Sequence, residues 1–276
     1  MSSSSVQKLL LEAGSYYQKQ LYGPNGRAAW HILQQRGLKE ETIGKFWLGY
    51  APGGQLITDN LSGSTVDFEE AGLTQESWKT NRIQSRFRNR LMFPLVQGGR
   101  VVGFGARAVL DEMPKYINSP ESKVYHKREF LYNADAARLA ARRAGRVVVV
   151  EGYFDAIACH ASGVPEVVAI CGTALTPNQA ILLREMASTV VLALDGDQAG
   201  IDATHRTIPL LLDQCLEVKV CAWNSKIEAK DPDEIRQKHG PLALLAQVNA
   251  SVSFPKWEEF SSERWSAIEK VQEALK

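Results

Sequence analysis

The sequence predicts an α/β protein with a mixed α/β N-terminal part, a mostly parallel, Rossmann-like sheet after it, and a short C-terminal helical segment. Three observations lead to this class. Four short apolar runs alternate with helix-like stretches after residue 146, two strand-like runs flank a glycine pair, and the first 37 residues show helical spacing of apolar side chains. Apolar strands that alternate with helices are typical of a parallel sheet covered on both faces.

The first part of the chain is expected to be mainly helical. Residues 6–22 place apolar side chains at helical spacing, and the Gly-Pro-Asn-Gly sequence at 23–26 predicts a turn. A second helix is expected over residues 27–37, where Gly37 ends it, and a third, shorter helix over residues 39–47.

A loop and a hairpin are expected next. Residues 51–65 are rich in glycine, serine and asparagine and predict a loop. Residues 91–107 predict two antiparallel strands, because Gly98 and Gly99 stand between two β-rich runs.

The parallel sheet is expected from residue 146 onward. The predicted strands are the runs RVVVVEG, EVVAICGT, TVVLALDGD and EVKVCAW, and the predicted helices between them cover residues 153–162, 176–187 and 198–214. Residues 234–276 predict further helix, with a break at Phe254-Pro255.

Charge is distributed unevenly along the chain although the formal net charge is only +1. Residues 79–146 carry 15 lysines and arginines against five acids, a net charge of about +10, so the remainder is about −9. The small net charge excludes a uniformly basic, histone-like protein. A basic half beside an acidic half suggests a polyanion-binding surface and a metal or acid site. For Arg138, Arg142, Arg143 and Arg146, which stand at helical spacing, a solvated helical face is the favoured interpretation.

The cysteines and the apolar runs limit the class further. The four cysteines form no C-x-x-C pair, so we expect no zinc in this chain, and they fit a reducing compartment. The apolar runs are too short to span a bilayer, so we expect no membrane contact and a cytoplasmic location.

Acidic residues follow three of the predicted strands. Glu151 comes directly after VVVV, Asp195 and Asp197 follow VVLAL, and Asp231 and Asp233 lie in the loop after the fourth strand. Ligands of open α/β sheets bind beyond the carboxyl ends of the strands. Carboxylates that converge there repel one another unless a cation joins them, and such oxygen ligands suit Mg²⁺ or Mn²⁺.

The alternative for each acid is a helix cap, because aspartate at a strand end often caps the next helix. For Asp233 alone, cap and ligand are balanced. For Glu151, Asp195 and Asp197 together, a ligand role is favoured, since Gly152 and Gly196 let the backbone turn beside them.

Several motifs resemble one known family. EGYFDAIACHASG, ICGTALT, LALDGDQAGIDAT and KDPDE resemble the Toprim domain of bacterial DnaG-type primases, a domain also found in topoisomerases, recombination mediators and some nucleases. RGLKEETIGKFWLGYAP, NRLMFPLVQGGRVVGFGAR and MPKYINSPESKVYHKREFLYN are similar to the basic N-terminal subdomain of the primases.

The resemblance implies three regions. These are a basic N-terminal primase subdomain over residues 1–143, a Toprim catalytic subdomain over 144–235, and a C-terminal helical segment over 236–276. Such primases usually carry a zinc ribbon and a helicase-binding domain as well, so we expect this chain to represent the RNA-polymerase core, without the binding domain for the replicative helicase.

The resemblance also implies roles for individual residues. Glu151, Asp195 and Asp197 match catalytic and metal-binding acids, and Asp155, Asp231 and Asp233 match further metal-binding acids. The positions that match template or nucleotide contacts are Arg36, Arg107, Lys115, Asn118 and Lys127.

The implied activity is DNA-directed RNA primer synthesis by nucleotidyl transfer, with two or more Mg²⁺ or Mn²⁺ ions. The expected partners are single-stranded DNA, nucleoside triphosphates and the RNA–DNA heteroduplex product, at the replication fork in the nucleoid. A Toprim nuclease and a non-catalytic single-strand-binding adaptor are the rival functions, because the same acids or the same fold would serve them.

Overall fold

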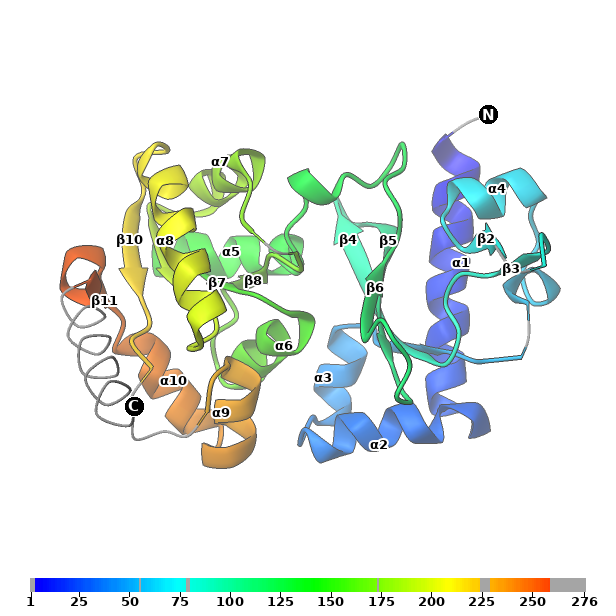
Figure 1. Ribbon diagram of the computed structural model, residues 1–276, viewed down its shortest axis with the longest axis horizontal. Helices are drawn as coiled ribbons and strands as arrows, with labels where there is room; N and C mark the ends of the chain where they lie inside the picture. The colour runs from blue at the N-terminus through cyan, green and yellow to red at the C-terminus, as the bar shows by residue number, and fades with distance from the viewer. Residues whose placement is uncertain (1–2, 55, 78–79, 173, 224–228, 259–276) are drawn as a thin grey trace, which may run out of the picture. The chain divides into compact units, whose positions relative to one another are not determined.

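The computed structural model describes residues 3–258, apart from residues 55, 78–79, 173 and 224–228. The chain divides into two compact units, one ending at Asp135 and the other beginning at Ala136. Each unit contains a sheet of its own (Figure 1). Within the described part of the chain, no helix has the length and apolar character needed to cross a membrane.

The first unit is built on an antiparallel four-stranded sheet with the order β1-β4-β5-β6. The strands are β1 (Gly49–Ala51), β4 (Arg90–Gln97), β5 (Arg100–Ala108) and β6 (Tyr116–Asn118). The predicted hairpin is confirmed as β4 and β5. Gly98 and Gly99 have φ of 59° and 70°, a left-handed conformation that glycine adopts without strain and that the tight turn requires.

The long helix α1 (Ser3–Tyr22) packs against β1 and β5. The Tyr17 ring meets Phe104 of β5 edge to face, with ring centroids 5.3 Å apart. Phe104 also contacts Phe87, so one face of the sheet forms the core of this unit.

Short elements complete the first unit. They are η1 (Pro24–Gly26), α2 (Arg27–Gln35), α3 (Glu40–Lys45), η2 (Ile57–Asp59), α4 (Thr65–Glu70), β2 (Thr74–Glu76), β3 (Ile83–Ser85) and η3 (Lys127–Glu129). The second and third predicted helices are thus confirmed as α2 and α3.

The loop prediction for residues 51–65 is wrong in part. This segment contains η2, and α4 begins at its end. A capping box starts α4, because the Ser64 hydroxyl accepts from the Asp67 N–H at 3.1 Å and the Asp67 carboxylate accepts from the Ser64 N–H at 3.2 Å. The hairpin of β2 and β3 was also not predicted, since neither strand shows a long β-rich run.

The second unit contains a five-stranded sheet with the order β11-β10-β9-β7-β8. The strands are β7 (Arg146–Val150), β8 (Val167–Ala169), β9 (Thr189–Leu192), β10 (Glu217–Val220) and β11 (Val252–Ser253). Strands β7 to β10 pair in parallel, as the four apolar runs predict, and β11 pairs antiparallel with β10.

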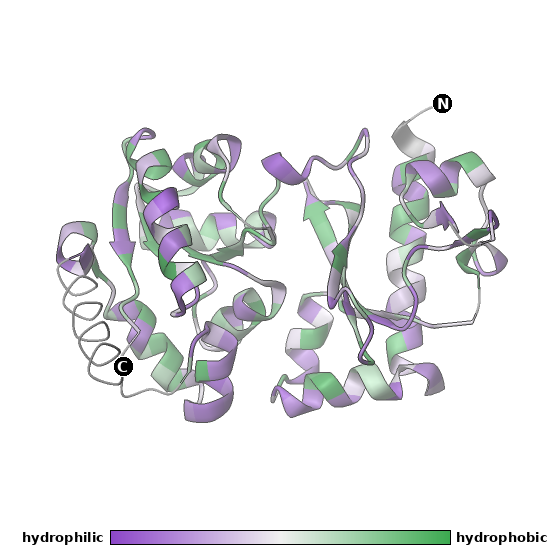
Figure 2. Ribbon diagram, viewed as in Figure 1, coloured by the Kyte–Doolittle hydropathy of each residue, from purple (hydrophilic) through white to green (hydrophobic). Residues whose placement is uncertain are grey.

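Helices surround this sheet. They are α5 (Ala134–Ala144), α6 (Tyr153–Ala161), α7 (Pro177–Met186), α8 (Gln198–Leu212), α9 (Pro232–His239) and α10 (Pro241–Asn249). Helices α6, α9 and α10 pack with one another, and α7 packs with α8, an arrangement typical of a doubly covered sheet. Figure 2 shows β4 of the first unit as hydrophobic and α9 as mainly hydrophilic, as expected for a core strand and a surface helix.

The predicted helical break at Phe254-Pro255 is wrong. The interruption lies one to four residues earlier, where β11 pairs with β10. Residues 254–258 are helical, and Pro255 stands in the first turn, where its missing N–H has no intrahelical partner to lose. The rest of the predicted helix, residues 259–276, lies outside the described residues.

Candidate functional site

The carboxyl ends of β7 and β9 form the centre of the candidate site. From β7 the chain crosses to β8 on one side of it and then returns to β9 on the other side. Such a reversal of strand order opens a crevice, and ligands of α/β sheets bind there. Glu151 follows β7 directly, and its Oε1 accepts a hydrogen bond from the Asp195 backbone N–H at 3.0 Å.

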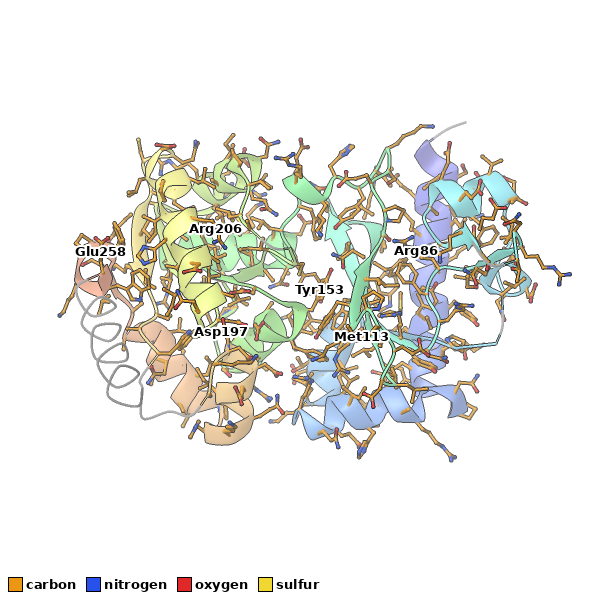
Figure 3. The ribbon with its side chains drawn as sticks, in the orientation of Figure 1. Arg86, Met113, Tyr153, Asp197, Arg206 and Glu258 are labelled. Carbon is orange, nitrogen blue, oxygen red and sulfur yellow. The ribbon has the colours of Figure 1, made fainter. Side chains whose placement is uncertain are left out.

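Two of the predicted acids cap helices that start at this edge. Asp197 is the N-cap of α8, where its Oδ1 accepts from the Gly200 N–H at 3.1 Å. Asp231 is the N-cap of α9 and accepts from the Glu234 N–H at 2.7 Å. Asp197 and Asp231 therefore both act as helix N-caps in the structure, the role that the sequence offered as the alternative to cation binding. Figure 3 labels Asp197 at the start of α8.

Asp155 joins two of these helices. Its Oδ2 accepts from the Gly152 N–H at 3.1 Å, and its Oδ1 accepts from the Asp233 N–H of α9 at 3.3 Å. Asp233 itself is buried, with 5% of its surface exposed, and its Oδ2 accepts from the Gln237 side chain at 2.8 Å. Asp233 therefore is not the cap that the sequence allowed, because Asp231 occupies that position.

Electrostatic repulsion among these carboxylates is strongest at Asp195. Burial and then the neighbouring acids, in the order Asp155, Glu151, Asp231 and Asp197, raise the pKa of the Asp195 carboxyl to about 8. All four neighbours act in the same direction, so the second unit concentrates negative charge around Asp195. The structure thus brings five of the six predicted acids within electrostatic reach of one another.

A divalent cation fits this site in charge and in donor chemistry. The donors are carboxylate oxygens, which Mg²⁺ and Mn²⁺ prefer, and a cation would relieve the repulsion that raises the pKa of Asp195. Among the described residues, however, no group of three or more acidic, histidine or cysteine side chains is already arranged around one point. Asp197 and Asp231 each direct one carboxylate oxygen toward a helix N–H group.

The backbone of the D-G-D segment is held by residues that the sequence analysis missed. The Trp223 indole N–H donates to the Leu194 carbonyl at 2.6 Å, and the Gly196 N–H donates to the Lys230 carbonyl at 2.6 Å. Gly200 packs so closely that a Cβ there would lie 2.1 Å from the Asp195 carbonyl oxygen. Trp223 is 28 residues from Asp195 in the chain, so only the fold reveals the contact.

The sheet of the first unit carries two of the five predicted template-binding residues, Arg107 and Asn118. Arg107 of β5 pairs with Tyr116 of β6, and Gly105 pairs with Asn118. Directly paired residues in antiparallel strands point to the same face, so Arg107, Tyr116 and Asn118 share one face. The opposite face contains Phe104 and packs into the core.

The other three predicted residues lie nearby or outside the sheet. Lys115 is exposed and directly precedes β6, where its carbonyl accepts from the Ala108 N–H at 2.8 Å. Lys127 is exposed in η3, and its backbone N–H donates to Glu121 at 2.9 Å. Arg36 is half-buried at the C-cap of α2.

Two further arginines support this face, and the sequence analysis did not single them out as site residues. Arg86 donates to the Asn118 carbonyl from Nε at 3.3 Å and from Nη2 at 3.0 Å, and the buried Arg90 donates to the Lys115 carbonyl at 3.4 Å. The signal in the sequence was the alternating Arg86, Arg88 and Arg90 before the hairpin, a strand-like period of two. Arg86 is labelled in Figure 3.

Comparison with known families matches both units. The model for the N-terminal domain of the DNA primase catalytic core matches residues 16–138, and a Toprim-like model matches residues 148–236. The two matches cover most of the chain and do not overlap.

Individual relatives agree with the family models. The DNA primase of Halalkalibacterium halodurans is 40% identical over 220 residues, which cover 78% of this chain and 36% of that protein. The catalytic core of the Escherichia coli primase superposes with a TM-score of 0.83 at 31% identity, covering 93% of this chain and 83% of that one. A DnaG primase catalytic domain solved with single-stranded DNA gives a TM-score of 0.82 at 31% identity, covering 91% and 80%. The chain therefore spans about a third of the curated relative and most of the solved catalytic domains.

Proposed function

The chain belongs to the DnaG primase family, and on that premise we propose that it synthesises short RNA primers on single-stranded DNA during replication. The reaction joins nucleoside triphosphates by nucleotidyl transfer, as a DNA-directed RNA polymerase does. We assign template binding to a basic N-terminal subdomain over residues 1–143 and catalysis to a Toprim subdomain over 144–235. The third proposed region, residues 236–276, begins inside α9, and its described part also contains α10 and β11.

The proposed catalytic residues are Glu151, Asp195 and Asp197, and Asp155, Asp231 and Asp233 are proposed to assist in holding divalent cations. When bound, Mg²⁺ or Mn²⁺ would neutralise the charge that develops on the triphosphate and lower the pKa of the attacking hydroxyl. In the reaction the 3′-oxygen forms a bond to the α-phosphorus, the bond to pyrophosphate breaks, and the hydroxyl proton leaves. We assign to Glu151 the role of holding a cation or receiving that proton.

The proposed template-binding residues are Arg36, Arg107, Lys115, Asn118 and Lys127. Phosphate contacts fix the position of a strand without reading its sequence, so cations beside an aromatic ring suit a template of any sequence. Arg107, Tyr116 and Asn118 on one face of β5 and β6 support this assignment. The Arg86 and Arg90 contacts support it too, because they fix the backbone of Asn118 and Lys115.

One observation carries the proposal furthest. Glu151 and Asp195 meet where the strand order reverses, and burial together with four neighbouring carboxylates raises the pKa of Asp195 to about 8. A structural role alone would not require so much unbalanced negative charge at one sheet edge, whereas a cation-dependent reaction on phosphates does.

The experiment that tests the proposal uses labelled nucleoside triphosphates, an unlabelled single-stranded template and Mn²⁺. Labelled oligonucleotides are the expected product, and EDTA should abolish them. Shortening of the template without labelled product would indicate a nuclease instead. A mobility shift with neither product would indicate a single-strand-binding adaptor, and either result would overturn the proposal.

A further inference from the structure

The loop between β5 and β6 exposes apolar side chains beside the proposed template-binding residues. Leu110 has 60% of its surface exposed and Met113 has 85%, and Tyr116 at the start of β6 has 40%. Single exposed apolar residues are common on proteins. Three within seven positions of one hairpin form an apolar tip, defined here as Leu110 and Met113, with Tyr116 at its base. Met113 is labelled in Figure 3.

Hydrogen bonds fix the backbone of this loop. The Val109 N–H donates to the Asn89 carbonyl at 3.0 Å, and the Glu112 N–H donates to the Leu110 carbonyl at 2.7 Å. The Asn89 side chain also donates to the Glu112 carboxylate at 3.2 Å. The apolar tip is therefore held outward by an organised loop, and a partner that covers it would spend little free energy on ordering it.

The charges around the tip indicate what kind of partner covers it. Exposed Lys115 follows the loop directly, and Arg107 lies in the strand that precedes it. The loop contains two acids. Glu112 accepts a hydrogen bond from Asn89, whereas Asp111 is exposed and offsets part of the positive charge of Lys115 and Arg107. A partner that offers apolar faces and phosphates at close spacing fits this hairpin. Unpaired nucleic acid does so, while a duplex hides the faces of its bases.

We propose that Leu110 and Met113 contact unpaired bases of the single strand whose phosphates Lys115 and Arg107 bind. This inference rests on the proposed function and adds a second kind of contact to it. The cations hold the backbone of the strand, and the apolar tip holds its bases without reading their identity, because aliphatic side chains make no hydrogen bonds to base edges.

The test compares two labelled strands of equal length, oligo-dT and the same sugar–phosphate backbone without bases, by fluorescence anisotropy over a range of salt concentrations. The double variant Leu110→Ser/Met113→Ser should bind oligo-dT roughly tenfold more weakly than the wild type, and should bind the abasic strand equally well. The slope of log K against log salt should stay unchanged, because no phosphate contact is lost.

Two controls make the outcome specific. Leu11→Ser removes a leucine with 53% exposure from α1 of the same unit and should change neither affinity. Lys115→Ala should weaken the binding of both strands to the same extent and reduce the slope of log K against log salt by roughly 0.7.

The outcomes separate this inference from the proposed function. Equal affinity of the double variant and the wild type for oligo-dT, or an equal loss on both strands, would overturn base contact by the tip while leaving the Lys115 result intact. Failure of the wild type to bind either strand would overturn both the inference and the template assignment. Unfolding of the double variant is checked by circular dichroism, and Met113→Ser alone then provides the same comparison.

Discussion

A substitution at Glu151 can remove the negative charge of the side chain without removing its structural hydrogen bond. Its Oε1 accepts from the Asp195 N–H, and glutamine at this position retains that acceptor oxygen. Glu151→Gln should therefore abolish primer synthesis while the melting temperature in EDTA stays equal or rises, because one source of repulsion at Asp195 is gone. The exposed Glu185, which pairs with Arg138 on the surface, gives the control Glu185→Gln, with wild-type yield expected. Wild-type yield from Glu151→Gln would refute the catalytic assignment.

Asp195 should make the metal-free protein sensitive to pH. Its folded-state pKa of about 8 lies above its ordinary value of 3.8, so the folded state binds more protons than the unfolded chain between these limits. The associated stability is fully present below about pH 4 and is lost as the pH rises through about 8. Asp195→Asn removes this dependence, so its free energy of unfolding should exceed that of the wild type in EDTA at pH 8.5 and converge with it at pH 4.

Urea unfolding at the two pH values checks the Asp195 prediction. We expect the difference between variant and wild type to change by about 1–3 kcal/mol, discounted from the full shift because the carboxyl is partly solvated. Mg²⁺ should reduce the difference at pH 8.5, since in the wild type the cation offsets the charge of Asp195, which the variant lacks. A difference that does not vary with pH would contradict the electrostatic interpretation.

At the level of elements, the start of α8 should tolerate no added side chain. The three atoms nearest to a Cβ at Gly200 would be backbone atoms of Asp195, the nearest at 2.1 Å, and backbone cannot move aside as a flexible side chain can. Gly200→Ala should destabilise the protein by about 1–3 kcal/mol and reduce primer synthesis, because the D-G-D segment must shift. Gly44 in α3 has no atom within 4 Å of the corresponding position, so Gly44→Ala should be neutral or stabilising. Thermal melts and primer assays on both variants test this prediction. Equal stability and equal primer yield of the two variants would show that the D-G-D segment is not fixed by this contact.

The sequence predicted the parallel strands and the positions of the acids beyond the strand ends, because both signals are local. A buried strand such as β7 is a continuous apolar run, and Glu151 stands at its end. The elements that were missed have no such signal. Strands β2 and β11 are short and owe their existence to a partner strand, and Trp223 reaches the Leu194 carbonyl only after folding. The sequence likewise does not show whether Asp197 and Asp231 cap helices or bind a cation, because aspartate suits both roles.

At the level of the whole molecule, the two units should respond differently to Mg²⁺. The proposed cation-binding acids all belong to the unit that begins at Ala136, and the proposed template-binding residues all belong to the other. Mg²⁺ should therefore slow amide hydrogen exchange at the starts of α6, α8 and α9, while leaving the peptides of α1 and β5 unchanged, because a ligand stabilises what it binds. Hydrogen exchange with mass spectrometry checks this, with Ca²⁺-free EDTA buffer as the reference. Protection spread equally over both units would show that the cation acts elsewhere or on the whole chain.

The caps at Asp197 and Asp231 bear on how this protein could change over evolution. Asparagine caps a helix about as well as aspartate does, so a single mutation to asparagine at either position would preserve the hydrogen bond to Gly200 or Glu234. It would also remove a negative charge that disfavours the ionised form of Asp195. The cap hydrogen bond therefore does not require aspartate at these two positions, and the repulsion at Asp195 disfavours it. Under the proposed function, selection for the cation-dependent reaction would retain them, and a descendant released from that selection would be expected to drift to asparagine there while its fold persists.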